Sequence, residues 1–139
     1  MKVKDIMTRG VVAVGLDDSV GHLQELFKSH RFHHLLVKSG ETLLGVISDR
    51  DLLKNTSPFL GDAFSELPRD RARLNRRAHQ IMTRKLVATT EEVTVEEAAR
   101  LMLDHTVSCL PVIDDRQHPI GIVTRKDILR GLVACLVKS

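Results

Sequence analysis

The chain contains one nine-residue pattern twice, as Gly45-Val46-Ile47-Ser48-Asp49-Arg50-Asp51-Leu52-Leu53 and as Gly121-Ile122-Val123-Thr124-Arg125-Lys126-Asp127-Ile128-Leu129. Upstream of each copy, Ile6-Met7-Thr8-Arg9 recurs as Ile81-Met82-Thr83-Arg84. The spacing between the copies is constant apart from a one-residue insertion. A repeat of this kind decides the architecture, because it means two structural units built alike.

Each copy is predicted to follow the order strand, helix, strand, strand, helix. Apolar spacing and β-branched residues predict strands at 11–14, 35–37 and 43–47 in the first copy, and at 86–88, 110–113 and 120–123 in the second. A helix should follow the capping candidates Ser19 and Thr94, and a second helix should follow Ser48 and Thr124. The fold class is therefore α/β (α+β), with a sheet covered on one face by helices. One copy lies near the lower size limit for a core, so two copies packed sheet to sheet are predicted.

The composition is that of an ordinary globular protein. Of 139 residues, 42% are hydrophobic and 28% charged, which excludes disordered and coiled-coil classes. Lys and Arg number 21 against 18 Asp and Glu, so the net charge of +3 does not indicate nucleic acid or membrane as a partner. With two cysteines, no membrane-length apolar run and no signal segment, a reduced cytoplasmic protein is expected. The predicted division is 1–54, an Arg-rich linker with a helix at 55–80, and 81–139.

The tandem Ile-Met-Thr openings, the strand Leu110-Pro111-Val112-Ile113-Asp114 and the repeated closing pattern resemble the CBS domain family. The two copies look like one CBS pair, or Bateman module, with β-α-β-β-α motifs related by a pseudo-twofold axis. The layout is similar to stand-alone bacterial CBS-pair proteins of the acetoin-utilisation type. The resemblance implies a non-catalytic regulatory homodimer that binds AMP, ADP, ATP or S-adenosylmethionine in clefts between the copies and signals to an unidentified partner protein. It implies no tightly bound cofactor.

The closing pattern itself suits a nucleotide. Ser48 and Thr124 stand at helix starts, where free backbone N–H groups and the helix dipole favour a phosphate. Three residues later, Asp51 and Asp127 return to the same end of the helix, where a carboxylate can accept ribose hydroxyls. Ser-x-x-Asp and Thr-x-x-Asp also form plain capping boxes, which contribute about 0.5–2 kcal/mol to stability and nothing to function.

The resemblance implies two sites, each completed by the opening strand of the other copy. Site A would contain Thr8, Val11, Ala13, Ile122, Thr124, Lys126 and Asp127. Site B would contain Thr83, Leu86, Ala88, Val46, Ser48, Arg50 and Asp51. Site A is predicted to bind more tightly, since Thr124-Arg125-Lys126 has two cations where Ser48-Asp49-Arg50 has one cation and one carboxylate. His33, His34 and Leu36 replace the small residues and the proline that the family usually has, and their rings could fill part of site A or stack on a base.

Other functions have less support in the sequence. A metal site at His22, His30, His33 and His34 is disfavoured because adjacent strand residues point to opposite faces, so no metal is predicted. The arginines of residues 69–77 could bind the phosphate backbone of a nucleic acid, but the interleaved acidic residues argue against this function. Cys109 and His105 do not form a catalytic pattern, so no enzyme is predicted. The alternatives are a ligand-free protein-interaction module and a nucleic-acid-binding regulator that uses the linker arginines.

Overall fold

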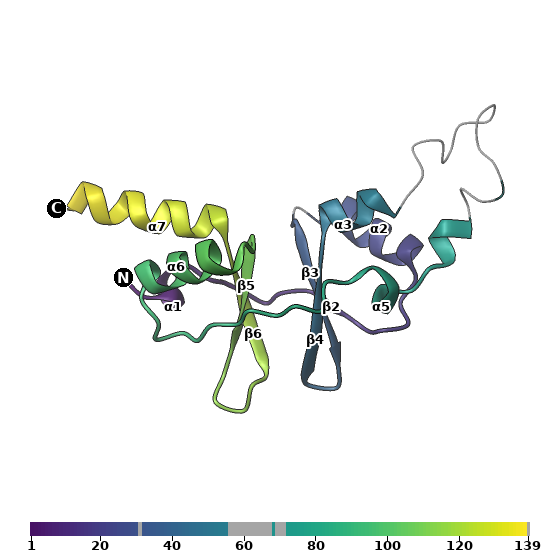
Figure 1. Ribbon diagram of the computed structural model, residues 1–139, viewed down its shortest axis with the longest axis horizontal. Helices are drawn as coiled ribbons and strands as arrows, with labels where there is room; N and C mark the ends of the chain where they lie inside the picture. Colours follow the sequence, from purple (N-terminus) through teal and green to yellow (C-terminus); the bar gives the residue numbers. More distant parts are fainter. Residues whose placement is uncertain (31, 56–67, 69–71, 139) are drawn as a thin grey trace. The chain divides into compact units, whose positions relative to one another are not determined.

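A computed structural model describes residues 1–30, 32–55, 68 and 72–138 (Figure 1). The chain divides into two compact units that are interleaved in sequence. Unit 1 comprises residues 1–11, 41–43 and 85–139, and unit 2 comprises 12–40 and 44–84. Each unit therefore takes the main part of one repeat and the opening segment of the other. The consecutive division 1–54, 55–80 and 81–139 follows the repeats and does not coincide with these compact units.

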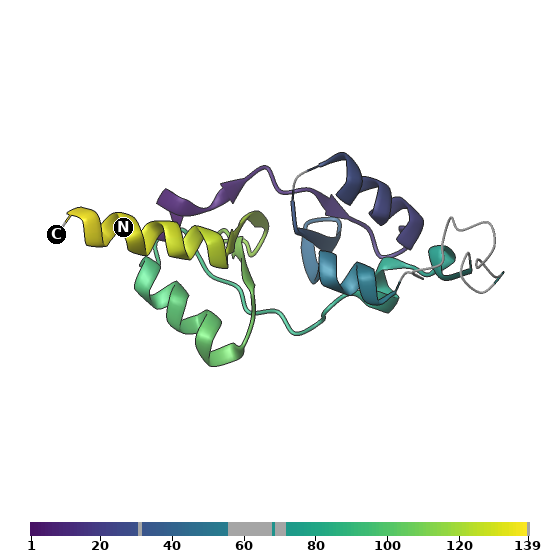
Figure 2. The same cartoon turned by 90° about the horizontal axis from the view of Figure 1, so that it is seen from above.

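Unit 1 is built on a three-stranded sheet in the order β1-β6-β5. Strand β5 (Cys109–Ile113) pairs antiparallel with β6 (Pro119–Thr124), and β6 pairs antiparallel with the short β1 (Thr8–Arg9). Helices α6 (Val95–His105) and α7 (Arg125–Lys138) lie on one face of this sheet (Figures 1 and 2). The core consists of buried apolar residues of these elements and one residue of the N-terminal helix α1 (Val3–Ile6): Val3, Val95, Ala98, Met102, Leu110, Val112, Val123 and Ile128.

Unit 2 also has a three-stranded sheet, in the order β2-β3-β4, so that its central strand is β3 and its closing strand β4 lies at the edge. Strand β2 (Ala13–Val14) runs parallel to β3 (His34–Ser39), which neighbours β4 (Thr42–Ser48). Helices α2 (Val20–Ser29) and α3 (Asp49–Lys54) cover one face. The short helix α5 (Ala78–Ile81) supplies Ala78 and Ile81 to the core, which also contains Leu23, Leu35, Val37 and Ile47. The mixed α/β class that the sequence predicts is confirmed.

The opening segments differ from the prediction. The first is divided between two sheets, because Thr8 and Arg9 pair with β6 whereas Ala13 and Val14 pair with β3. The predicted strand 86–88 is wrong: only an isolated bridge from Thr89 to Val112 forms there, with the intervening chain not in regular structure. The predicted linker helix falls largely on residues that lie outside the described part of the chain. The described part of the linker contains a 3-10 turn, η1 (Arg73–Asn75), and the first residues of α5.

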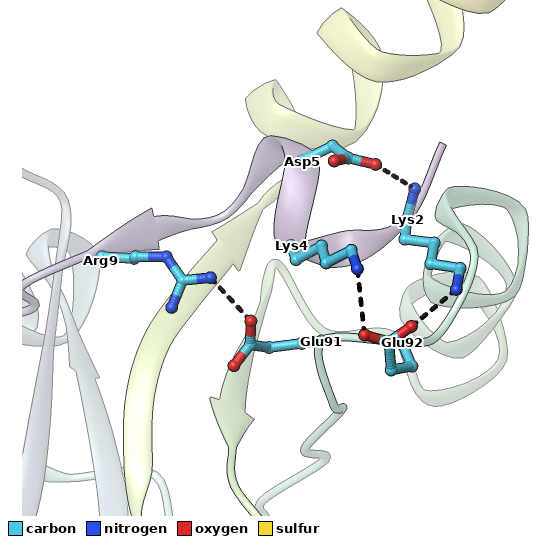
Figure 3. A network of polar contacts seen from close by, with 6 residues as sticks. All are labelled: Lys2, Lys4, Asp5, Arg9, Glu91 and Glu92. Carbon is cyan, nitrogen blue, oxygen red and sulfur yellow. Dashed lines mark hydrogen bonds and ion pairs between the residues drawn. The ribbon is translucent and has the colours of Figure 1, made fainter.

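The N-terminal segment is held on unit 1 by its backbone and one buried side chain. Val3 is fully buried, its N–H donates to the Val93 carbonyl at 2.8 Å, and the Val95 N–H donates to the Met1 carbonyl at 3.1 Å. Ion pairs surround this anchor (Figure 3): Lys2 and Lys4 contact Glu92, and Arg9 contacts Glu91. Hydrogen bonding and charge from Lys2 and Lys4 lower the pKa of the Glu92 carboxyl. Because these pairs are exposed, the buried valine dominates the attachment.

None of the helices in the described part is long and apolar enough to span a bilayer.

Candidate functional site

The start of α7 carries the more enclosed of the two closing motifs. Oδ2 of Asp127 accepts hydrogen bonds from the Thr124 backbone N–H at 2.9 Å and from the Thr124 hydroxyl at 3.0 Å. The Asp127 N–H in turn donates to Thr124 Oγ1 at 3.4 Å. Asp127 is only 8% exposed, and within the described residues no hydrogen bond reaches its Oδ1. The cap therefore uses one carboxylate oxygen and leaves the other available to a ligand hydroxyl.

The start of α3 repeats this arrangement in unit 2. Ser48 N–H donates to Asp51 Oδ2 at 2.9 Å, and Asp51 N–H donates to Ser48 Oγ at 3.1 Å. Both residues are half-buried. The capping box and a nucleotide site are therefore compatible at each helix start, because capping occupies only one oxygen of the carboxylate.

The opening segments place a threonine beside each closing strand. Thr8 is paired with Ile122 in β1–β6, two residues before Thr124. In unit 2, Thr83 N–H donates to the Val46 carbonyl at 2.8 Å, and Val46 N–H donates to the Thr83 carbonyl at 3.1 Å. The same pairing thus occurs once in each unit.

Most of the predicted site residues fall within one unit each. Unit 1 contains six of the site A residues: Thr8, Val11, Ile122, Thr124, Lys126 and Asp127. Unit 2 contains five of the site B residues: Val46, Ser48, Arg50, Asp51 and Thr83. Ala13 belongs to unit 2, and Leu86 and Ala88 belong to unit 1, so neither unit brings these three together with the remainder of their predicted sites. Leu86 and Ala88 instead line a cavity of about 450 Å³ in unit 1, together with residues 41–43 and 116–118.

Glycines allow the close approach of the opening segments. A Cβ at Gly121 would lie 2.6 Å from the Thr8 carbonyl oxygen and would also overlap Met7. A Cβ at Gly45 would lie 2.6 Å from Met82 Sδ and 3.0 Å from the Thr83 carbonyl oxygen. The pairing of each opening segment with its closing strand therefore requires glycine at both positions. In the sequence, this contact is indicated by the recurrence of glycine as the first residue of the nine-residue pattern.

The charged residues beside the helix starts differ between the units. Arg125, the residue after Thr124, lines an apolar groove between α6 and α7. At the matching position of unit 2, Asp49 pairs with His33, with 2.9 Å between Oδ2 and Nδ1. The equivalence of these positions is visible in the backbone: Asp49 N–H donates to the His33 carbonyl, and Arg125 N–H donates to the Ser108 carbonyl. Sequence reasoning missed the His33–Asp49 pair.

The pKa of His34, in unit 2, is lower than the usual value for histidine. Burial lowers the pKa of its imidazole, and the positive charge of His33 acts in the same direction, while Asp49 and Asp51 oppose it. A histidine held neutral in the folded protein takes up a proton more readily once the chain unfolds.

We therefore expect unit 2 to lose stability when the pH falls. The folded-state pKa of His34 lies below the unfolded value of about 6.5, so the unfolded chain binds more protons as the pH drops through that value. The melting midpoint, measured by circular dichroism between pH 7.5 and 5.5, should fall less in His34→Gln than in the wild type. Gln24→Ala, which changes a non-titrating side chain of α2 in the same unit, is the control and should leave the pH dependence unchanged. An identical pH dependence in wild type and His34→Gln would contradict the assignment.

His30 and two of the linker arginines, Arg76 and Arg77, have local partners. The ring of His30 stacks on Phe32 with centroids 5.1 Å apart, and the described residues contain no group of three or more side chains suited to a metal. Arg76 donates to Asn55 Oδ1 at 2.8 Å, and Arg77 donates to the Asp17 carbonyl at 2.9 Å. These contacts give both arginines a structural role. Arg69 and Arg71 lie outside the described residues.

Comparison with known proteins identifies the family. The CBS domain model matches residues 3–57 and 78–134, and the chain belongs to the CBS domain family. A CBS domain-containing protein of Dictyostelium discoideum is 34% identical over 96% of this chain and 92% of its own length. The chain also matches longer proteins, and it spans only 23% of a homoserine O-acetyltransferase of Methanocorpusculum labreanum.

Solved structures of CBS pairs share the fold. The pair of protein MJ0100, crystallised with 5′-methylthioadenosine and S-adenosyl-L-methionine, is 25% identical with a TM-score of 0.78 over 97% of this chain and 98% of its own. CBSX2 in complex with AMP is 30% identical with a TM-score of 0.76 over 99% and 98%. A Vibrio cholerae protein assigned to acetoin utilization (AcuB) matches at 22% identity and a TM-score of 0.75 over 99% and 93%, a likeness of fold alone.

Proposed function

We propose that this chain is a non-catalytic regulatory module that binds an adenosine-containing ligand and acts as a homodimer. AMP, ADP, ATP and S-adenosylmethionine are the candidate ligands, with ribose hydroxyls bound by Asp127 in site A and by Asp51 in site B. The observation that carries the proposal is the enclosed Asp127 carboxylate, which caps α7 through Oδ2 and keeps Oδ1 available. The adenosine ligands of the two similar CBS pairs support it.

Within site A, the chain supplies complementary groups at neighbouring positions. Thr124 lies at the start of the 14-residue helix α7, where the N-terminal dipole and free N–H groups stabilise a phosphate. Lys126 adds a positive charge on the first turn. Thr8, paired with Ile122, brings a backbone edge and a hydroxyl next to the same strand end. Regulation requires that the ligand bind two arrangements of the protein with different affinity.

A thermal-shift screen tests this proposal. A ligand that binds only the folded chain raises stability by about 2.7 kcal/mol at a hundred times its dissociation constant, or several degrees in melting temperature. We expect such a shift with at least one of AMP, ADP, ATP and S-adenosylmethionine, and we expect Thr124→Ala to reduce it strongly.

Thr94→Ala is the matched control. Thr94 caps α6 by accepting a hydrogen bond from Glu97 N–H at 3.1 Å, so its loss costs about 1 kcal/mol of capping energy without touching site A. Thr94→Ala should keep the full ligand shift. If no ligand shifts the wild type at millimolar concentration, the ligand-free interaction module is the better description. A melting shift produced by nucleic acid alone would favour the linker arginines.

A further inference from the structure

A cavity of unit 1 lies at the hairpin end of its sheet, away from the start of α7. Its volume is about 450 Å³, within the range of small-molecule sites. One wall is formed by residues 116–118 of the loop that joins β5 to β6. Figure 1 shows this loop at the end of the sheet opposite α6 and α7. Thr124 lies at the other end of β6, roughly 17 Å along the strand from Pro119, so the cavity is separate from that helix start.

The one-residue insertion that interrupts the repeat falls in this hairpin. The offset between the copies is 75 residues at Val112 and 76 at Gly121, so the extra residue lies between them. The pairing of β5 with β6 is irregular at the same place, with a register shift between Val112 and Ile113. The first repeat joins β3 to β4 by residues 40–41 alone. The longer loop that lines the cavity is therefore a feature of the second repeat.

The carboxylate of Asp114 holds this loop in one conformation. Its Oδ1 accepts hydrogen bonds from the His118 N–H at 2.8 Å and from the Arg116 N–H at 2.9 Å. These two bonds lower the pKa of the carboxyl, which is therefore charged at neutral pH. The Gln117 N–H donates to the Asp114 carbonyl at 2.9 Å, and Gln117 has a left-handed backbone with φ of 65°. The loop is thus ordered by its own contacts, which reduces the entropy that a ligand must lose on binding.

The wall formed by Leu86 and Ala88 is anchored to strand β5. The Thr89 N–H donates to the Pro111 carbonyl at 2.9 Å, and the Ile113 N–H donates to the Thr89 carbonyl at 2.9 Å. These two bonds place the residues before Thr89 beside the end of β5, where they line the cavity. Leu86 and Ala88 therefore have a defined position although they form no strand.

The lining of the cavity combines an apolar wall with charges of both signs. Leu43, Leu86 and Ile113 supply apolar surface, and all three are half-buried. Arg116 and Glu41 supply the charges. Within the described part of the chain, the Arg116 guanidinium forms no ion pair or hydrogen bond. A carboxylate has about four acceptor positions, so Glu41 can bind a ligand ammonium in addition to a neighbour in the chain.

A zwitterion with an apolar side chain matches this lining. A simple anion would meet the like charge of Glu41, and a simple cation would meet that of Arg116. An α-amino acid carries a carboxylate and an ammonium on one carbon atom, so both protein charges find an opposite charge. Arg is also well suited to a carboxylate, because its planar guanidinium can form two parallel hydrogen bonds with it.

We propose that this cavity binds a free α-amino acid with an apolar side chain. Arg116 binds the carboxylate and Glu41 binds the ammonium. The side chain of the ligand contacts Leu43, Leu86 and Ile113. This site goes beyond the adenosine-binding module of the proposed function, whose ribose-binding carboxylates lie at the helix starts, and it gives the chain a second ligand of a different chemical class.

Calorimetric titration of the full chain with L-leucine, L-methionine and L-phenylalanine tests the site. We expect saturable binding of at least one of them, with a dissociation constant below about 1 mM. The amide of that amino acid lacks the carboxylate charge, and its deaminated acid lacks the ammonium. Each analogue should therefore bind about tenfold more weakly. Absence of binding by all three amino acids at millimolar concentration would overturn the proposal, and so would equal binding of the amino acid and its amide.

Two variants test the assigned orientation. Arg116→Gln should weaken amino-acid binding about tenfold and should no longer distinguish the amino acid from its amide. Glu41→Gln should no longer distinguish the amino acid from its deaminated acid. Both side chains are exposed, so the melting temperature should change little. Arg100→Gln removes an exposed arginine of α6 and is the matched control, which should bind as the wild type does. An equal loss in Arg100→Gln and Arg116→Gln would overturn the assignment.

Variants at the helix starts separate this site from the adenosine sites. Thr124→Ala and Asp51→Asn should keep their affinity for the amino acid, and Arg116→Gln should keep the full melting shift with an adenosine ligand. Loss of amino-acid binding in a folded Thr124→Ala or Asp51→Asn protein would place the amino acid in an adenosine site and overturn the proposal. Amino-acid binding without any nucleotide-induced shift would support this site and overturn only the adenosine proposal.

Discussion

Gly121→Ala should destabilise the protein by about 3 kcal/mol, the largest loss of stability that we expect from adding a single methyl group to this chain. The added Cβ would lie 2.6 Å from the carbonyl oxygen of Thr8, and backbone cannot rotate away as a side chain can. Relief requires β1 to separate from β6, which also removes Thr8 from the neighbourhood of Thr124. Thermal or urea unfolding should show the loss, at roughly 10 °C in melting temperature, and adenosine-ligand binding should weaken with it.

Two other glycines provide graded controls for this variant. Gly45→Ala should cost less, because the nearest atom to its Cβ is the flexible Met82 Sδ and the Thr83 carbonyl oxygen is 3.0 Å away. Gly21→Ala lies within α2, where the nearest contact is 3.5 Å, so it should leave stability unchanged or raise it by up to about 1 kcal/mol. Equal melting temperatures for Gly121→Ala and Gly21→Ala would show that β1 is not held against β6 in solution.

Much of the fold was predictable because the sequence repeats. The helices after Ser19 and Thr94 form where the caps predict them, and both caps make their hydrogen bonds. Strands β3 and β5, which begin at His34 and Cys109, also coincide with apolar runs, and these runs are buried. Local periodicity identifies such elements because each buries one face regardless of its partner.

The segments that failed prediction depend on distant partners. Residues 86–88 have strand-like composition, but only Thr89 finds a bridging partner, so propensity alone predicted a strand that does not form. The short helices α1 and α5 have four residues each, too few for periodicity to detect, and they are fixed by burial of Val3 and of Ala78 and Ile81 in the two cores.

The candidate site shows the same limit. The sequence indicated the capping pattern at Ser48 and Thr124, and these bonds are present. It did not indicate that Arg125 would line the α6/α7 groove, because the direction of a first-turn side chain depends on the neighbouring helix.

Asp127→Ala should weaken adenosine-ligand binding more than Asp51→Ala. Each variant loses the hydrogen bonds of a carboxylate to ribose hydroxyls, and hydrogen bonds to charged groups contribute about 1.5–3 kcal/mol, or roughly tenfold to a hundredfold in affinity. Asp127 is more buried than Asp51, so its bonds compete less with water. The Asp49 carboxylate next to Ser48 also opposes a phosphate at site B, although His33 pairs with it. Calorimetric titration with AMP measures both variants directly.

Asn substitutions separate ligand binding from helix capping in this comparison. Asp127→Asn keeps an oxygen that can accept the Thr124 N–H bond, so the cap largely survives, whereas the negative charge that strengthens bonds from ribose hydroxyls is lost. Asp127→Asn should therefore melt close to the wild type without ligand and still bind AMP at least about tenfold more weakly. If Asp51→Ala gives the larger loss, site B is the principal site. If Asp127→Asn binds as tightly as the wild type, the carboxylate acts only as a cap, because the variant keeps the helix start but has lost the negative charge and one acceptor oxygen.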